Sequence, residues 1–93
     1  MKERAIQHKV VLYLRANGWL VWKNHGSQFS PAGLPDLCAI KDGLFIAIEV
    51  KVPRKKPTPV QLAWIADIND HGHYAFWGDN LPGIKYLLEG LWK

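Results

Sequence analysis

Hydrophobic residues recur along the chain at two spacings, one typical of helices and one typical of strands. In the first segment Ile6, Val10 and Leu14 recur every four residues, as on the buried face of an amphipathic helix. Shorter runs rich in β-branched and aromatic residues predict strands. The pattern predicts seven elements: a helix over 2–16, strands over 19–23, 36–40 and 44–51, a helix from 58 to about 70, a strand over 73–77 and a helix over 81–92.

Turn-forming residues separate these segments. An Asn-Gly pair at 17–18 ends the first helix, and the Asp-Gly pair at 42–43 predicts a two-residue hairpin between two strands. The Thr-Pro-Val-Gln run at 58–61 is a capping box with proline at the first helical position. The order α-β-β-β-α-β-α predicts a single α/β domain over residues 1–93, built as a mixed β-sheet flanked by helices.

Composition narrows the class of protein. The 93 residues are 48% hydrophobic, which is too apolar for a disordered chain. The lone cysteine, Cys38, excludes an internal disulfide and a cysteine-based zinc site. No apolar run approaches the roughly 20 residues that span a bilayer, and no signal peptide opens the sequence, so we expect a cytoplasmic protein with no membrane partner. The net charge of +4 weakly favours an anionic partner such as nucleic acid.

Two carboxylates are predicted to face each other across the hairpin. With a two-residue turn, the register places Asp36 opposite Glu49, with Cβ atoms about 5 Å apart. Period-two alternation puts Lys51 on the same face as Glu49. Like charges directly opposite are destabilising, so this pair needs a cation, either Lys51 or a divalent metal. Carboxylate oxygens suit Mg²⁺ or Mn²⁺. The alternative is a surface salt bridge on an ordinary hairpin.

The same residues carry a resemblance to a nuclease family. Pro35-Asp36, twelve further residues and then Glu49-Val50-Lys51 resemble the PD-(D/E)xK nuclease signature, which is short and gives false positives alone. The surrounding motifs resemble VRR-NUC domains, the virus-type replication-repair nucleases. In chain order these are Glu3 with Gln7, Trp22-Lys23-Asn24, Gly33-Leu34-Pro35-Asp36, Glu49-Val50-Lys51 and Thr58-Pro59-Val60-Gln61.

The resemblance implies a PD-(D/E)xK fold, a Mg²⁺ or Mn²⁺ cofactor and roles for individual residues. It implies that Asp36, Glu49 and the Val50 carbonyl bind the metal and that Lys51 is catalytic. Glu3 matches an acidic residue of the family's first helix, and it lies within about 20° of the apolar stripe on a helical wheel. A favourable charge at a helix N-terminus is its alternative role.

Gln61 matches a family glutamine that approaches the metal-bound water or the phosphate. The capping box explains the same residue without catalysis, and we expect one side chain not to serve both roles easily.

Basic residues around these motifs are candidates for DNA contacts. Arg54, Lys55 and Lys56 form the clearest electrostatic patch, directly after Lys51, and phosphate contacts of this kind carry no base specificity. A solvated turn is the alternative. Lys23 and Asn24 stand at the entry to a loop over 24–35, together with His25 and Ser27. A loop of this length in a small domain is usually functional or mobile.

These observations predict a metal-dependent endonuclease that hydrolyses phosphodiester bonds without an organic cofactor. The sequence offers no base-reading module, so specificity for branched DNA such as a four-way junction is expected. We expect a homodimer, with Leu87, Leu88, Leu91 and Trp92 as an apolar patch shared between two copies. The alternatives are a non-catalytic DNA-binding module, a nuclease acting on ordinary duplex or flap DNA, and an inactive protein whose Asp36, Glu49 and Lys51 form a salt-bridge triad.

Overall fold

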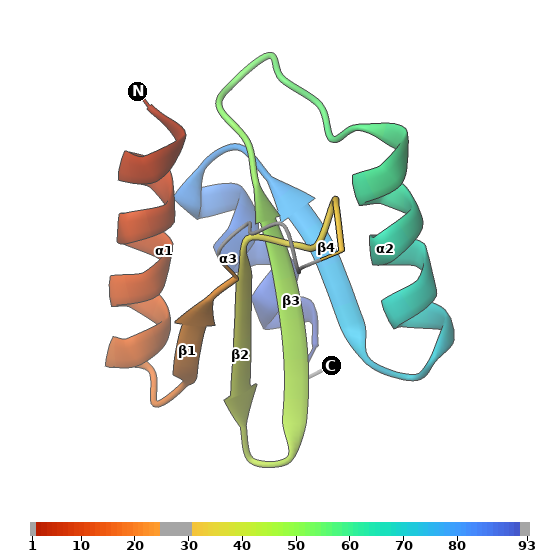
Figure 1. The fold of residues 1–93 in the computed structure, drawn as a ribbon. Helices are drawn as coiled ribbons and strands as arrows, with labels where there is room; N and C mark the ends of the chain where they lie inside the picture. Colours follow the sequence, from red (N-terminus) through yellow and green to blue (C-terminus); the bar gives the residue numbers. More distant parts are fainter. Residues whose placement is uncertain (1, 25–30, 92–93) are drawn as a thin grey trace.

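The computed structural model describes residues 2–24 and 31–91 and shows a four-stranded sheet with three helices (Figure 1). The strand order is β1-β2-β3-β4; β1 pairs with β2 and β2 with β3 in antiparallel fashion, and β4 is parallel to β3. In chain order the elements are α1 (Glu3–Ala16), β1 (Leu20–Lys23), β2 (Leu37–Lys41), β3 (Leu44–Val50), α2 (Pro59–Asp70), β4 (Tyr74–Gly78) and α3 (Leu81–Gly90). The predicted α/β class and element order are confirmed, with strand ends shifted by one residue.

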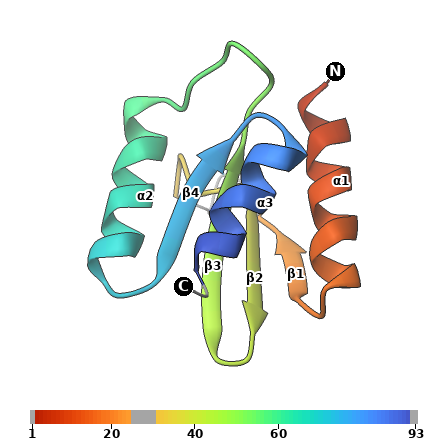
Figure 2. The ribbon, with the colours of Figure 1, turned by 180° about the vertical axis from the view of Figure 1, so that it is seen from behind.

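Helices lie on both faces of the sheet. Figure 2 shows α1 and α3 side by side over one face, where the main core forms. Helix α2 lies on the other face and packs through Ile65 and Ile68 on a smaller cluster of Cys38, Ala47 and Ala75. Strand β3 has a neighbour on each side, because α2 carries the chain from β3 to the parallel strand β4. The last five residues of β3, 46–50, are therefore all buried.

The hairpin between β2 and β3 has the predicted register. Asp42 and Gly43 both have positive φ, 51° and 79°, the backbone combination that a tight two-residue hairpin turn requires. Pairing runs from Lys41 with Leu44 to Leu37 with Ile48. The recorded pairs stop one residue before Asp36, whose carboxylate instead accepts a hydrogen bond from the Val50 N–H at 2.9 Å.

The apolar residues of α2 and α3 are buried to different degrees. In α2, Leu62 is 45% exposed, while Ile65 and Ile68 carry the packing. In α3, Leu88 is only 3% exposed and belongs to the main core, against which Leu91 also packs. The prediction that Leu87, Leu88 and Leu91 form a patch shared between two copies is therefore wrong, since two of these residues pack in the chain's own core. Trp92 lies outside the described residues.

None of the helices in the described part of the chain meets the requirements for a membrane span; the longest, α1, has 14 residues.

Gly33 is where the segment before β2 approaches the start of α2. Its φ is +81°, and a Cβ built on it would lie 2.5 Å from Val60 Cγ1 and 3.3 Å from the Gln61 nitrogen. Gly43 has nearly the same φ, yet a Cβ there would meet nothing within 4 Å.

We predict that Gly33→Ala lowers the free energy of unfolding by about 1–3 kcal/mol more than Gly43→Ala, measured by urea denaturation. Both variants share the strain of a left-handed alanine, so the difference isolates the overpacking against α2. Equal losses of unfolding free energy in the two variants would show that the start of α2 shifts to accommodate the added methyl group at no measurable cost.

Candidate active site

Three carboxylates from separate parts of the chain meet at one end of the sheet. Glu3 comes from the first turn of α1, Asp36 from the residue before β2 and Glu49 from β3. One ligand oxygen from each lies within 4.8 Å of the others. Glu3 and Asp36 are partly exposed, whereas Glu49 is 1% exposed. Glu3 points inward, as its helical position predicts, and so joins this cluster. Its negative charge is also favourable at the N-terminal end of α1.

Glu49 occupies an unusual environment for a carboxylate. Its Oε2 accepts a hydrogen bond from Gln61 Nε2 at 3.1 Å and lies 3.4 Å from the Lys51 ammonium nitrogen. Its other oxygen, Oε1, is buried and has no hydrogen-bond partner among the described residues. Burial raises the pKa of Glu49 to about 7, and the neighbouring Asp36 charge adds to the rise, while Lys51 opposes it.

Asp36 is held from two directions. Its Oδ2 accepts the Val50 N–H, and its backbone carbonyl accepts the Asn24 N–H at 2.8 Å. The Val50 side chain is buried in the main core, so this bond ties the carboxylate to a rigid part of β3. The Lys51 N–H continues the pairing with β4 by donating to the Gly78 carbonyl at 2.9 Å. The role of the Val50 carbonyl as a metal ligand stays a prediction.

Gln61 completes the capping box and also reaches the carboxylate cluster. Its Oε1 accepts the Thr58 N–H at 2.8 Å, and its own N–H donates to Thr58 Oγ1 at 3.2 Å, which completes the capping box. Its Nε2 remains available and donates to Glu49. The two ends of the amide thus have different partners, so the capping box does not keep the side chain away from the site. The predicted approach to a metal-bound water or the phosphate stays a prediction.

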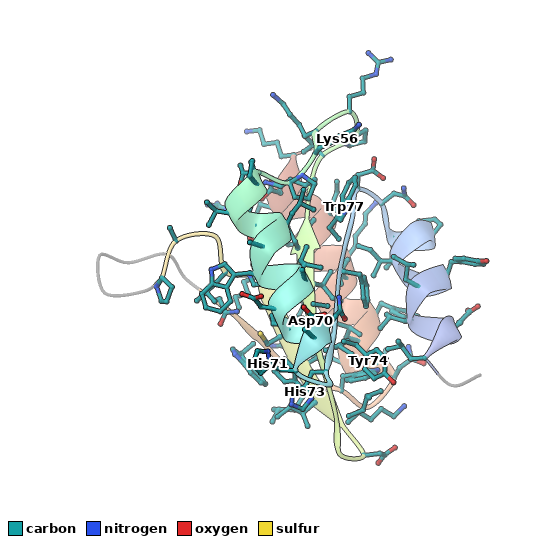
Figure 3. All side chains as sticks on the ribbon, turned by 90° about the vertical axis from the view of Figure 1, so that its right-hand side faces the viewer. Lys56, Asp70, His71, His73, Tyr74 and Trp77 are labelled. Carbon is teal, nitrogen blue, oxygen red and sulfur yellow. The ribbon has the colours of Figure 1, made fainter. Side chains whose placement is uncertain are left out.

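The basic candidates lie on the outside of the molecule. Lys23 is exposed at the end of β1, and Arg54, Lys55 and Lys56 are exposed in the turn between Lys51 and α2. Figure 3 shows Lys56 in this turn, at the opposite end of α2 from Asp70. The predicted loop residues His25 and Ser27 lie outside the described residues.

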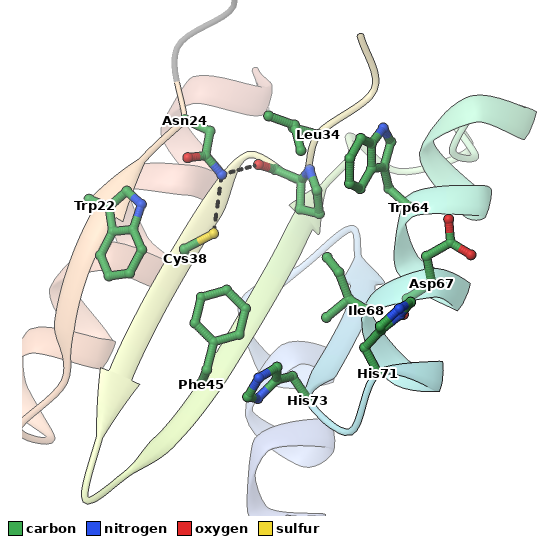
Figure 4. Close-up of a pocket in the computed structure, with 11 residues that line it drawn as sticks. Trp22, Asn24, Leu34, Cys38, Phe45, Trp64, Asp67, Ile68, His71 and His73 are labelled. Atoms are coloured by element: carbon green, nitrogen blue, oxygen red, sulfur yellow. Dashed lines mark hydrogen bonds between the residues drawn. The ribbon is translucent and has the colours of Figure 1, made fainter. Parts of the chain in front are cut away.

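Asn24 has a structural position that the sequence did not reveal. Its Nδ2 donates to the Pro35 carbonyl at 2.8 Å and to Cys38 Sγ at 3.1 Å (Figure 4). The residue thereby fixes the segment that carries Asp36. Its side-chain nitrogen is engaged within the fold, so a DNA contact through this group stays an untested prediction.

An apolar groove of about 540 Å³ lies beside the carboxylates, between α2 and the sheet (Figure 4). Its walls include Trp22, Phe45, Trp64 and His73, and Pro35 lines its end next to Asp36. The aromatic residues come from β1, β3, α2 and the turn before β4, which are distant in sequence, so no local pattern predicted the groove.

The donor set fits a hard divalent cation. Glu3, Asp36 and Glu49 supply only carboxylate oxygens, the ligands preferred by Mg²⁺ and Mn²⁺. A metal ion there would also give the unpartnered Glu49 Oε1 a partner, which the described protein groups do not provide.

Replacing Glu49 with glutamine tests the cost of its buried charge. Folded Glu49 holds a proton up to about pH 7, whereas the ordinary carboxyl releases it near 4.5. The folded state therefore binds the extra proton, and the free energy of unfolding falls as pH rises through this interval. We predict that Glu49→Gln raises the free energy of unfolding of the metal-free protein by about 1–3 kcal/mol at pH 8 and has little effect at pH 4.5. Urea denaturation in EDTA at both pH values measures this, and a variant less stable at pH 8 than wild type would contradict it.

Comparison with known proteins identifies the family to which the chain belongs. A model of the archaeal Holliday junction resolvase (Hjc) family matches residues 2–88, which is most of the chain. A solved VRR_NUC domain is 28% identical and superimposes with a TM-score of 0.81 over 94% of both chains. Two further structures show the fold alone. No curated protein matches.

The first of these two, a VRR_NUC domain protein, is 17% identical, with a TM-score of 0.78 over 96% of this chain and 86% of that one. The second, from Archaeoglobus fulgidus, is described as Hjc, a Holliday junction resolvase, and is 20% identical, with a TM-score of 0.66 over 85% of this chain and 69% of that one. The resemblance to VRR-NUC domains is thus confirmed, and the chain belongs to the archaeal Holliday junction resolvase (Hjc) family, within the PD-(D/E)xK nuclease superfamily.

Proposed function

We propose that the protein is a divalent-metal-dependent endonuclease that cuts branched DNA, with four-way junctions as the leading substrate. The observation that carries the proposal is the meeting of Glu3, Asp36 and Glu49 within 4.8 Å, with the Lys51 ammonium nitrogen 3.4 Å from Glu49. A salt-bridge triad alone does not account for three carboxylates beside one lysine, one of them almost fully buried.

Glu3, Asp36 and Glu49 would hold Mg²⁺ or Mn²⁺, and the backbone carbonyl of Val50 is a further candidate ligand. When bound, the ion would act as a Lewis acid toward the phosphate and lower the pKa of the water that it binds. Lys51 is partly exposed, and its ammonium group can orient the attacking water and stabilise charge that develops on the phosphate oxygens. Gln61 holds the Glu49 carboxylate in place through Nε2.

The substrate class is supported by the family and by the small size of the fold. The matching family is named for Holliday junction resolution, and within the described residues every helix packs on the sheet. None of these elements is free to act as a separate base-reading module, so recognition would come from DNA shape and phosphates. Lys23 and the exposed run of Arg54, Lys55 and Lys56 are proposed phosphate contacts.

The first experiment is cleavage of labelled four-way junction, flap, linear duplex and single-stranded DNA with Mg²⁺, Mn²⁺ or EDTA. We expect wild type to cut the junction preferentially and only with metal, and Lys51→Ala to lose at least 100-fold in rate, since both its positioning and its charge are removed. Lys9→Ala, an exposed lysine on α1, is the matched control and should cut normally.

Equal cutting of all substrates would keep the nuclease and remove the junction preference. Binding of junctions without cutting under either ion would instead favour a non-catalytic DNA-binding module.

The two contacts of Gln61 can be separated by substitution. Gln61→Glu keeps an acceptor for the Thr58 N–H but loses the donor to Glu49 and places another carboxylate beside it. We predict that Gln61→Glu reduces junction cutting more than tenfold. Thr58→Ala should cost about 1 kcal/mol of stability through the lost cap and leave cutting within a few fold. Similar cutting by the two variants would mean that the cap is the only role of Gln61.

A four-way junction calls for two cuts related by two-fold symmetry, so we propose a homodimer. The face proposed for the dimer, in place of the α3 stripe, is the sheet surface beside the apolar groove. We call this surface the open sheet face; it consists of Leu20, Trp22, Ile40 and Phe45. Leu20 is 67% exposed and Ile40 is 40% exposed, and no described helix covers this part of β1 and β2.

We predict that Ile40→Lys converts the dimer to a monomer, because the new ammonium would be buried at a two-fold interface without a partner. Tyr86→Lys, at an aromatic position on α3 that is 76% exposed, should leave the dimer intact. Sedimentation at micromolar protein with junction DNA present measures both. A wild type that sediments only as a monomer would contradict the dimer.

A further inference from the structure

Positive and negative charge are unevenly distributed along the chain. Residues 1–35 contain five of the twelve Lys and Arg residues but a single acidic residue, Glu3, which belongs to the candidate metal cluster. The five cations are Lys2, Arg4, Lys9, Arg15 and Lys23. The outer surface of α1 and β1 therefore carries positive side chains with no acidic residue of its own to offset them.

Residues 59–91 have the reverse balance, with four acidic residues and a single basic one, Lys85. Asp67 and Asp70 lie on α2, Asp79 precedes α3, and Glu89 lies near the end of α3. Figure 3 shows Asp70 at the end of α2 that is remote from Lys56. A polyanion that reaches the carboxylate cluster would therefore approach over the α1 side or the turn at 54–56, rather than across α2 and α3.

Cations on α1 line up on the flank that faces β1. Arg4, His8 and Arg15 fall within about 60° of one another on a helical wheel, and all three are exposed. His8, Arg15 and the exposed Lys23 of β1 surround a hollow of about 240 Å³. Its floor includes Val11 and Val21, each 6% exposed, so the charged side chains project from a packed, rigid base.

This hollow has the composition of a phosphate-contacting surface. Among the described residues that line it, none is acidic, and two are basic. The stripe on α1 begins at Arg4, directly after Glu3, and runs about 16 Å to Arg15 at 1.5 Å per residue. That length covers the axial rise of roughly five phosphates of one DNA strand.

We propose that Arg4, His8, Arg15 and Lys23, the α1–β1 basic surface, bind the phosphate backbone of one duplex arm as it leaves the carboxylate cluster. The inference rests on the proposed nuclease function and adds the path of the substrate. The turn at 54–56 contacts the DNA on the other side of the cluster, so the two basic regions together bracket the scissile phosphate.

The test is the salt dependence of junction binding in EDTA, with the double variant Arg15→Gln/Lys23→Gln. Each lost phosphate contact lowers the magnitude of the slope of log Kobs against log salt by about 0.9, so the double variant should lose about 1.8. The affinity advantage of wild type over the double variant should therefore grow about tenfold as salt falls from about 200 to about 50 mM. Lys9→Gln, on the opposite flank of α1, is the matched control and should keep the wild-type slope. Thermal melting confirms that all three proteins are folded.

The outcomes separate this inference from the proposed function. A double variant that binds with the wild-type slope while wild type cuts junctions would overturn the path along α1 and leave the nuclease intact. An equal loss of slope in Lys9→Gln would also overturn it, because the effect would then be one of overall charge. A wild type that neither binds nor cuts any DNA would refute the nuclease itself, and the inference with it.

Discussion

The structure depends on a carboxylate placed where a hydrophobic residue would be more stable. Glu49 lies on the central strand, is 1% exposed, and leaves one oxygen without a partner among the described residues. Burying such a charge costs free energy unless a cation compensates it, and Lys51 reaches only Oε2. The raised pKa of Glu49, about 7, reflects the same cost. The arrangement is understandable as a site that loses stability in the absence of metal and gains it when a cation binds.

The rest of the fold can be understood from how it brings partners to that position. The hairpin turn sets the register that brings Asp36 to the level of Glu49, and the Val50 N–H then fixes the Asp36 carboxylate. Helix α1 adds Glu3 from one side of the sheet, and α2 adds Gln61 from the other. The site thus requires both layers of the domain. That requirement explains why its residues span most of a short chain.

Local patterns sufficed for much of this site because its register is set by a local turn. Counting back from the Asp-Gly turn at 42–43 gives a register that places Asp36 near Glu49. Helical periodicity was enough to predict that Glu3 points inward. Long-range features were not predictable in this way. The position of β4 beside β3, the burial of Leu88 and the anchoring of Asn24 depend on contacts between segments distant in sequence. For Gln61, sequence reasoning treated capping and a place at the site as alternatives, whereas in the structure one end of the amide accepts from Thr58 and the other donates to Glu49.

The central claim is that the three carboxylates form one divalent-cation site, and calorimetric titration with Mn²⁺ in the metal-free protein tests it most directly. The account predicts binding to wild type with release of a proton near pH 6.5, because Glu49 must ionise before it can act as a ligand. It predicts at least tenfold weaker binding to Asp36→Asn and unchanged binding to Asp70→Asn, a carboxylate on the far end of α2. Equal Mn²⁺ affinity in wild type and Asp36→Asn would contradict the claim.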